Sequence, residues 1–152
     1  MDRYDTQILA LLQEDATLSV AELAEKVGLT STPCWRRVQK LEESGVIRKR
    51  VALLDPGKLN VGVTAFVTVK TSQHSAKWLD KFHALVASMP EVIEFYRIAG
   101  DTDYLLRVVV PDIAAYDAVY KKLIQGAELA DVSSRFAMEQ IKYTTALPLD
   151  YA

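Results

Sequence analysis

Residues 27–45, VGLTSTPCWRRVQKLEESG, combine a tight turn with the start, interior and end of one helix. Gly28 can adopt the left-handed conformation in which a preceding helix commonly ends. Thr32 followed by Pro33 predicts an N-cap with proline at the first helical position. Gly45 then ends the predicted helix. A helix that follows another across so short a turn is typical of a helix-turn-helix.

The two faces of this predicted helix differ in chemistry. At about 100° per residue, Cys34, Val38 and Leu41 share one face. Arg36 and Lys40 lie on the opposite face. We expect the first face to pack on the preceding helices and the second to remain exposed. A lone cysteine at the centre of the packed face is predicted to be a small core residue and not a reactive thiol.

Two further helices and a short strand complete the predicted first domain. Apolar residues recur at helical spacing within residues 4–12. A second helix is predicted over residues 17–27, with Ser19 and Glu22 at its N-terminus. Apolar and basic residues alternate over residues 46–51, which predicts a strand that would form the wing of a winged helix-turn-helix.

Charge is unevenly distributed along the chain. The net charge is −2, and residues 1–50 hold eight basic and eight acidic residues. Residues 32–50 alone hold six basic residues and two acidic ones, a net charge of +4. A local basic stripe is what phosphate contact requires, whatever the charge of the whole chain. A solvated helix face without any nucleic-acid role is the alternative explanation of the same stripe.

In a helix-turn-helix, side chains near the start of the second helix reach base edges, and neighbouring side chains contact phosphates. We therefore expect double-stranded DNA as a partner. The expected base contacts come from Ser31, Thr32, Trp35 and Arg36. The expected backbone contacts come from Arg37, Lys40, Arg48 and Arg50. Trp35 lies at the border of the buried face, so packing is the alternative role for its side chain.

The pattern of apolar residues changes from helical spacing to alternating strands and helices after a predicted turn at residues 55–58. The domain boundary is expected there. We predict a DNA-binding domain over residues 1–54, a linker over 55–60 and a second domain over 61–152. The second domain is predicted to contain a strand at 61–69, a helix at 78–89, strands at 92–99 and 104–110, a helix at 111–124 and a last strand at 132–145. The order βαββαβ is ferredoxin-like, with four antiparallel strands and both helices on one face. The fold class is therefore α+β.

The predicted sheet is apolar on both faces, although two helices cover only one. Residues 104, 106, 108 and 110 lie on one side of their strand, and Leu105 and Val109 lie on the other. An antiparallel sheet with one face in water should alternate cleanly between apolar and polar residues. We therefore expect the second face to meet the sheet of another copy, which makes the protein a homodimer at least. The alternative is that residues 1–50 cover that face within the same chain.

Residues 100–103, Gly-Asp-Thr-Asp, have the chemistry of an ordinary hairpin turn. Two carboxylates beside free backbone N–H groups could also hold the ammonium and the carboxylate of an amino acid. No catalytic set accompanies them. His74 and His83 have no cysteine or acidic partner at ligand spacing, so neither metal binding nor general-base chemistry is predicted.

The sequence also predicts where the protein acts. No apolar run approaches the roughly 18–20 residues that span a bilayer, and the charged N-terminus does not have the composition of a secretory signal. Cys34 is the single cysteine, so it has no partner for an internal disulfide. We therefore expect a cytoplasmic protein without a membrane partner.

Several stretches together resemble the leucine-responsive regulatory protein/AsnC (Lrp/AsnC) family, and the resemblance covers essentially the whole chain. The matching stretches are residues 2–5 with 8–9, 27–38, 41–47, 100–106 and 136–142. The resemblance implies an N-terminal DNA-binding domain and a C-terminal RAM domain, named for regulation of amino acid metabolism. It also implies a homodimer paired through the C-terminal sheets that assembles further, to a tetramer or an octamer.

The family resemblance further implies an amino-acid effector, and no cofactor, bound where dimers meet. By the match of the motif, one subunit would contribute Gly100, Asp101, Thr102, Asp103 and Tyr104. A neighbouring subunit would contribute Ser134 and Phe136 from the last strand. Arg135 lies within that strand at a position where the family varies, so the identity of the amino acid stays open.

The sequence thus predicts a DNA-binding transcription regulator that is not an enzyme and whose assembly and operator binding respond to an amino acid. Two alternatives belong to other functional classes. One is an oligomeric sensor whose helix-turn-helix no longer binds DNA. The other is a small enzyme built on the ferredoxin-like domain, a fold that hosts many chemistries.

Overall fold

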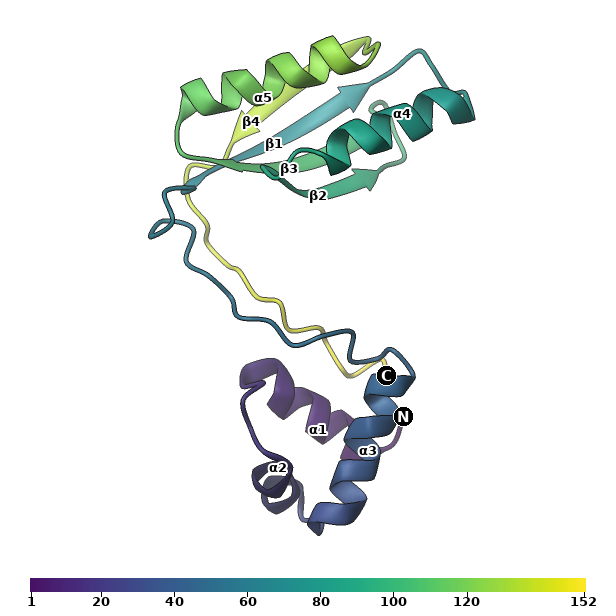
Figure 1. The fold of residues 1–152 in the computed structure, drawn as a ribbon, viewed down its shortest axis with the longest axis vertical. Coiled ribbons are helices and arrows are strands. Elements are labelled where there is room, and N and C mark those ends of the chain that lie inside the picture. Colours follow the sequence, from purple (N-terminus) through teal and green to yellow (C-terminus); the bar gives the residue numbers. More distant parts are fainter. The chain divides into compact units, whose positions relative to one another are not determined.

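The computed structural model describes residues 1–152, which form two compact units (Figure 1). The first unit comprises Met1–Leu53 together with Lys142–Ala152, and the second comprises Leu54–Ile141. The sequence analysis grouped residues 142–152 with the second domain, whereas the structure packs them with the first unit.

The first unit is built on three helices: α1 (Arg3–Glu14), α2 (Val20–Val27) and α3 (Ser31–Glu43). The structure confirms Ser19 and Glu22 at the N-terminus of α2, although the helix begins at Val20 and not at residue 17. The Ser19 side chain accepts a hydrogen bond from the Glu22 N–H, and the Glu22 carboxylate accepts one from the Ser19 N–H, which is a reciprocal capping box. Gly28 has a φ of 74° and ends α2 in the left-handed conformation, as predicted.

The predicted start of α3 was wrong by two residues. Thr30 is the N-cap, without a side-chain hydrogen bond, and the helix begins at Ser31. The first backbone bond of the helix runs from the Cys34 N–H to the Thr30 carbonyl. Pro33 therefore occupies the third helical position, where a missing N–H loses no bond within the helix.

The predicted wing strand over residues 46–51 was also wrong, since the structure assigns no strand there. The Ile47 N–H donates to the Leu41 carbonyl (3.0 Å) and its side chain packs on the core of the first unit. A strand requires a partner strand, and the first unit contains none. Alternation of residue types alone could not supply one.

The core of the first unit joins all three helices on the faces that the sequence predicted. Its buried residues are Ile8, Leu9, Leu23, Ala24, Val27, Cys34, Val38 and Leu41. Cys34 is fully buried, and its burial raises the pKa of its thiol above the ordinary value. The thiol therefore stays protonated and acts as a packing group, as predicted.

The last residues of the chain add to this unit through two kinds of contact. The Gln13 side chain donates to the Leu147 carbonyl (3.2 Å) and accepts from the Leu147 N–H (2.6 Å). Leu149, half-buried, packs against the core cluster. These contacts explain why residues 142–152 belong with the helices. Nothing in the local sequence pattern indicates them, because both partners lie more than a hundred residues away.

The second unit has the predicted βαββαβ order. Its elements are β1 (Val63–Lys70), α4 (Ala76–Ala87), β2 (Val92–Arg97), β3 (Tyr104–Val110), α5 (Ile113–Gly126) and β4 (Asp131–Phe136). The strands form one antiparallel sheet in the order β2-β3-β1-β4. The last strand is shorter than the predicted 132–145. Its partner β1 begins at Val63, so no strand continues beside residues that follow Ala137.

Both helices of the second unit lie on the same face of the sheet (Figure 1). Burial along β3 alternates strictly, with Tyr104, Leu106, Val108 and Val110 facing the helices. Phe82 of α4 is fully buried against this face. The main core of the unit therefore fills the layer between the sheet and its two helices.

The opposite face of the sheet also carries apolar side chains, as the sequence predicted. Leu105 and Val109 are partly exposed there, and the register pairs them with Thr68 and Thr64 of β1. Phe66 is 40% exposed on the same face. Neither α4 nor α5 covers this face, so within the second unit its apolar side chains lie open.

Candidate DNA-binding and effector sites

The residues predicted to contact DNA bases lie exposed at the start of α3. Ser31, Thr32 and Arg36 are exposed, and Trp35 is 49% exposed. The opposite face of this turn of α3 is fixed in place, because Cys34 and Val38 are buried in the core of the unit. A helix anchored on one face in this way presents its polar face as a rigid surface.

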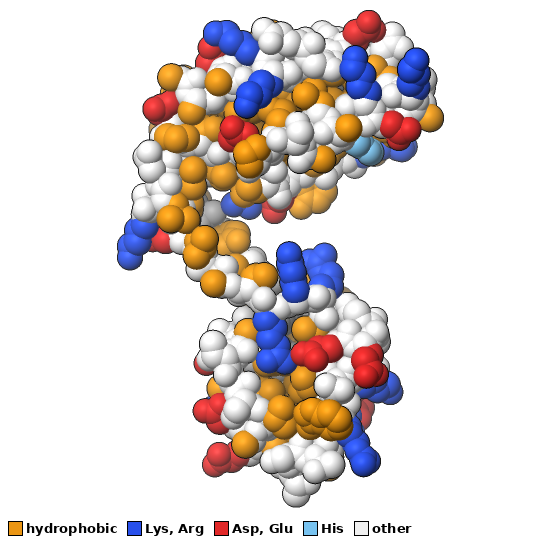
Figure 2. All heavy atoms as spheres, in the orientation of Figure 1, with side chains coloured by type: hydrophobic (Ala, Val, Ile, Leu, Met, Phe, Trp, Pro, Cys, Tyr) orange, Lys and Arg blue, Asp and Glu red, His pale blue; other side chains and the backbone are white.

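Lys40 and Arg48 extend the exposed basic surface from α3 into the segment that follows it. Arg36, Lys40 and Arg48 form no ion pair within the chain. Exposed Lys and Arg side chains are visible on the first unit in Figure 2. Arg50 donates to Glu42 (2.9 Å), and both side chains are 41% exposed. An exposed pair of this kind contributes little to stability, so Arg50 can exchange Glu42 for a phosphate.

Arg37 differs from the other basic residues of α3. Its guanidinium donates to Asp2 (2.7 Å) and to Asp5 (2.8 Å), and it lies 5.3 Å from the centre of the Tyr4 ring. The carboxyl groups of Asp5 and Asp2 raise the pKa of Arg37. The sequence assigned Arg37 to phosphate contact, whereas the structure engages it with the start of α1.

Carboxylates at helix and turn positions make the first unit sensitive to acid. Hydrogen bonds from the Ser19 side chain and N–H lower the pKa of Glu22, and bonds from the Asp5 N–H and Arg37 lower the pKa of Asp2. A carboxyl group whose pKa is lower in the folded state stabilises the fold above its ordinary pKa. That contribution is lost as the pH falls from the ordinary pKa of the group through its lowered pKa in the folded state.

We therefore expect the Glu22→Gln variant to lose stability less steeply than the parent as the pH falls below the ordinary glutamate pKa of about 4.3. The glutamine can still cap α2 but has no proton to gain. Urea unfolding followed by circular dichroism at a series of acidic pH values measures the slope. Glu43→Gln is the matched control, because Glu43 is exposed on α3 and takes part in no ion pair. Equal slopes for Glu22→Gln and the parent would contradict the prediction.

The predicted effector loop connects β2 with β3. Gly100 has a φ of 123°, a conformation that favours glycine, and Asp101 is exposed. Asp103 is occupied within the fold. Its carboxylate accepts from the Thr71 N–H (2.8 Å), its own N–H donates to the Val69 carbonyl and its carbonyl accepts from the Ile98 N–H. Of the two carboxylates in the motif, Asp101 is the one that faces solvent without a partner.

Tyr104, the last residue of the predicted effector motif, belongs to the core. It is 6% exposed, and its ring centre lies 5.2 Å from Phe82, 5.5 Å from Phe95 and 6.1 Å from Trp78. Burial raises the pKa of its phenol above the ordinary value. The aromatic cluster fixes the point at which the loop enters β3.

Ser134 and Phe136 lie apart from this loop within one chain. They are on the helix-facing side of β4, which β1 separates from β3. The Ser134 hydroxyl is hydrogen-bonded to that of Tyr116, and the Phe136 ring meets the Tyr116 ring edge-on at 5.1 Å. The sequence proposed that these residues act from a neighbouring subunit.

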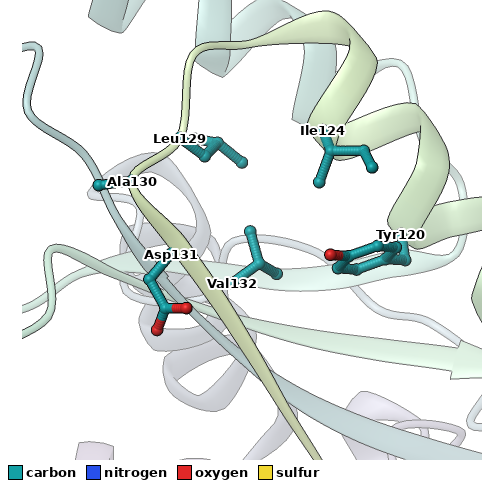
Figure 3. Close-up of a pocket in the computed structure, with 6 residues that line it drawn as sticks. All are labelled: Tyr120, Ile124, Leu129, Ala130, Asp131 and Val132. Atoms are coloured by element: carbon teal, nitrogen blue, oxygen red, sulfur yellow. The ribbon is translucent and has the colours of Figure 1, made fainter.

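The structure contains a small open hollow that the sequence did not indicate. It has a volume of about 200 Å³ and lies between the end of α5 and the start of β4 (Figure 3). Its lining residues are Tyr120, Ile124, Leu129, Ala130, Asp131 and Val132. No motif marks it, because two ordinary elements create the hollow only when they pack. Its lining combines apolar side chains with one phenol and one carboxylate.

No group of three or more His, Cys, Asp or Glu side chains is placed to share a metal ion. No helix has both the length and the apolar character needed to cross a membrane.

Comparison with known proteins matches both units to families. Residues 1–48 match a winged helix-turn-helix DNA-binding domain, and residues 64–147 match the Lrp/AsnC ligand binding domain. The DNA-binding transcriptional activator DecR of Escherichia coli K12 is 53% identical over 151 residues, which are 99% of each chain.

Solved structures give the same result at the level of the fold. An AsnC family transcriptional regulator from Agrobacterium tumefaciens is 68% identical, with a TM-score of 0.96 over 99% of each chain. A transcriptional regulator from Neisseria meningitidis, solved as a complex with L-Met, is 37% identical, with a TM-score of 0.94 over 99% of this chain and 98% of that one. The resemblance found in the sequence is confirmed, and the chain belongs to the Lrp/AsnC family of transcription regulators.

Proposed function

We propose that this protein is a DNA-binding transcription regulator of the cytoplasm whose operator binding responds to an amino acid, with no cofactor and no catalytic step. The observation that carries the proposal is the exposed start of α3, where Arg36 and Lys40 form no ion pair. The opposite face of the helix is fixed, because Cys34 and Val38 are buried in the core of the first unit. Such a helix can enter the major groove without rearrangement.

The contacts divide by position along the basic surface. Ser31, Thr32, Trp35 and Arg36 lie at the end of the helix that meets base edges. Lys40, Arg48 and Arg50 lie further along the chain and contact phosphates, which position the protein without reading sequence. Arg37 keeps α1 against α3 through its two ion pairs, and so supports the reading helix instead of touching DNA.

The amino acid binds at the loop between β2 and β3. Asp101 supplies a free carboxylate for the ammonium group, and the backbone N–H groups of Gly100 and Thr102 face the ligand carboxylate. Tyr104 anchors the loop in the core. The L-Met complex of the Neisseria meningitidis relative supports an amino acid as the ligand. Ser134 and Phe136 would complete the site from a neighbouring subunit.

Assembly connects the two sites. The open face of the sheet carries Phe66, Leu105 and Val109, and pairing this face with that of a second copy removes apolar surface from water. The resulting homodimer assembles to a tetramer or an octamer. An amino acid that prefers one arrangement of dimers shifts the population toward it and changes the spacing of the DNA-binding units.

The experiment that tests this function begins with selection from a pool of random duplexes by the full-length protein. The selected duplex is then titrated by fluorescence anisotropy at low and high salt, with and without each common L-amino acid. We expect one enriched sequence, affinity that falls steeply with salt and a change on adding at least one amino acid. Failure to enrich any sequence would reject the DNA-binding role. Enrichment without any amino-acid effect would reject the effector role alone.

A further inference from the structure

Thr71 is buried, at 4% exposure, and immediately follows β1. A buried hydroxyl must find hydrogen-bond partners, because leaving it unpaired is costly. Besides Gln73 in its own loop, Thr71 has partners in two distant segments of the second unit, and both segments belong to the sites described above.

The first segment is the effector loop. The Thr71 N–H donates to the Asp103 carboxylate at 2.8 Å, and the preceding backbone contact, from the Asp103 N–H to the Val69 carbonyl at 2.9 Å, reinforces the connection. The Asp103 carboxylate therefore bonds to the end of β1, 32 positions away along the chain.

The second segment leads to the hollow. The Thr71 hydroxyl lies 3.3 Å from the Glu128 carbonyl and 3.4 Å from the Gln73 carbonyl, and it accepts from the Gln73 N–H at 2.9 Å. The neighbouring Lys70 carbonyl accepts from the Ala130 N–H at 2.8 Å. The end of β1 thus bonds to Glu128 and to Ala130, the residues on either side of Leu129. Leu129 and Ala130 line the hollow in Figure 3.

We propose that Thr71 is a positioning residue for effector binding, which holds the loop at Gly100–Asp103 and the segment at Glu128–Asp131 in one fixed arrangement. Asp103 acts through Thr71 and not by contact with the ligand. The proposal rests on the effector function proposed above. Because one residue bonds to both segments, to the loop through its backbone N–H and to the Glu128 carbonyl through its hydroxyl, displacement of the loop by a bound amino acid is transmitted to the segment that lines the hollow.

The test compares Thr71→Val with Thr71→Ser in the full-length protein. Valine keeps the shape of threonine and loses the hydroxyl, whereas serine keeps the hydroxyl. Each common L-amino acid is added alone, and its Kd is measured by calorimetry. Valine retains the backbone N–H that bonds Asp103, but it loses the hydroxyl contacts with Glu128 and Gln73 that fix the end of β1. We expect the loosened end of β1 to weaken the binding of the responsive amino acid about ten-fold in Thr71→Val, as loss of buried hydrogen bonds would, and Thr71→Ser to stay close to the parent. Affinity for DNA without amino acid stays unchanged in both variants.

A second pair of variants tests the role of Asp103 independently, even if Thr71→Val does not fold. Asp103→Asn keeps an oxygen that accepts from the Thr71 N–H and removes the charge, so it should bind the amino acid nearly as the parent does. Asp103→Ala removes both and should lose binding. The proposal is overturned if Thr71→Val binds the amino acid with parental affinity, or if Asp103→Asn is as damaging as Asp103→Ala. A parent protein that binds no amino acid overturns the effector function as well.

Discussion

The Arg36→Ala variant is expected to bind the selected duplex about ten- to a hundred-fold more weakly than the parent, which corresponds to the roughly 1–3 kcal/mol of a good side-chain contact to a base. Arg36 is exposed on α3 and has no ion-pair partner within the chain. Removing it therefore leaves no buried charge or cavity, and the unfolding midpoint should stay the same. Fluorescence anisotropy measures the affinity, and thermal unfolding measures the stability.

Arg37→Ala is the matched comparison, because it removes the same side chain one position along the same helix. Its loss breaks the ion pairs with Asp2 and Asp5 and the contact with Tyr4. We expect a lower unfolding midpoint for this variant, and a loss of DNA affinity that largely disappears when binding is measured well below that midpoint. If the Arg36→Ala variant binds the duplex with the affinity of the parent, the proposal that α3 contacts DNA is contradicted.

The contrast between these adjacent arginines marks a limit of sequence analysis. A helical wheel places a side chain on one face of its own helix, and it placed Arg36 on the exposed face correctly. It contains no information on Asp2 and Asp5, which reach Arg37 from α1, more than thirty positions earlier. Local periodicity and capping signals predicted the helices and the core of the first unit. Ion pairs between elements depend on tertiary packing, which those signals do not describe.

The same limit applies to the second unit. The order of elements followed from hydrophobic patterns, because a two-residue period and a helical period are distinguishable within a few residues. The end of β4 was not predictable in this way, since it depends on where β1 begins. The role of Asp103 was equally hidden. Its motif suggested a ligand contact, and the partner that engages its carboxylate, Thr71, lies in another loop.

Phe82→Ala is expected to destabilise the second unit by about 3–5 kcal/mol, the usual loss for a buried phenylalanine. Phe82 is fully buried, and its ring centre lies 5.0 Å from Trp78 and 5.2 Å from Tyr104. Alanine leaves a cavity between α4 and the sheet and removes these ring contacts, which a rigid core does not refill. Because Tyr104 begins β3 next to the effector loop, amino-acid binding should weaken together with stability.

Urea unfolding, monitored by tryptophan fluorescence and by circular dichroism, measures the loss. Lys81→Ala is the control, since it replaces an exposed neighbour on the same helix and should change the stability by less than about 0.5 kcal/mol. A Phe82→Ala loss near that of Lys81→Ala would mean that the aromatic cluster does not hold α4 on the sheet. In that case the effector loop would have to be fixed by Thr71 and its hydrogen bonds alone, and Thr71→Val would become the more damaging of the two substitutions.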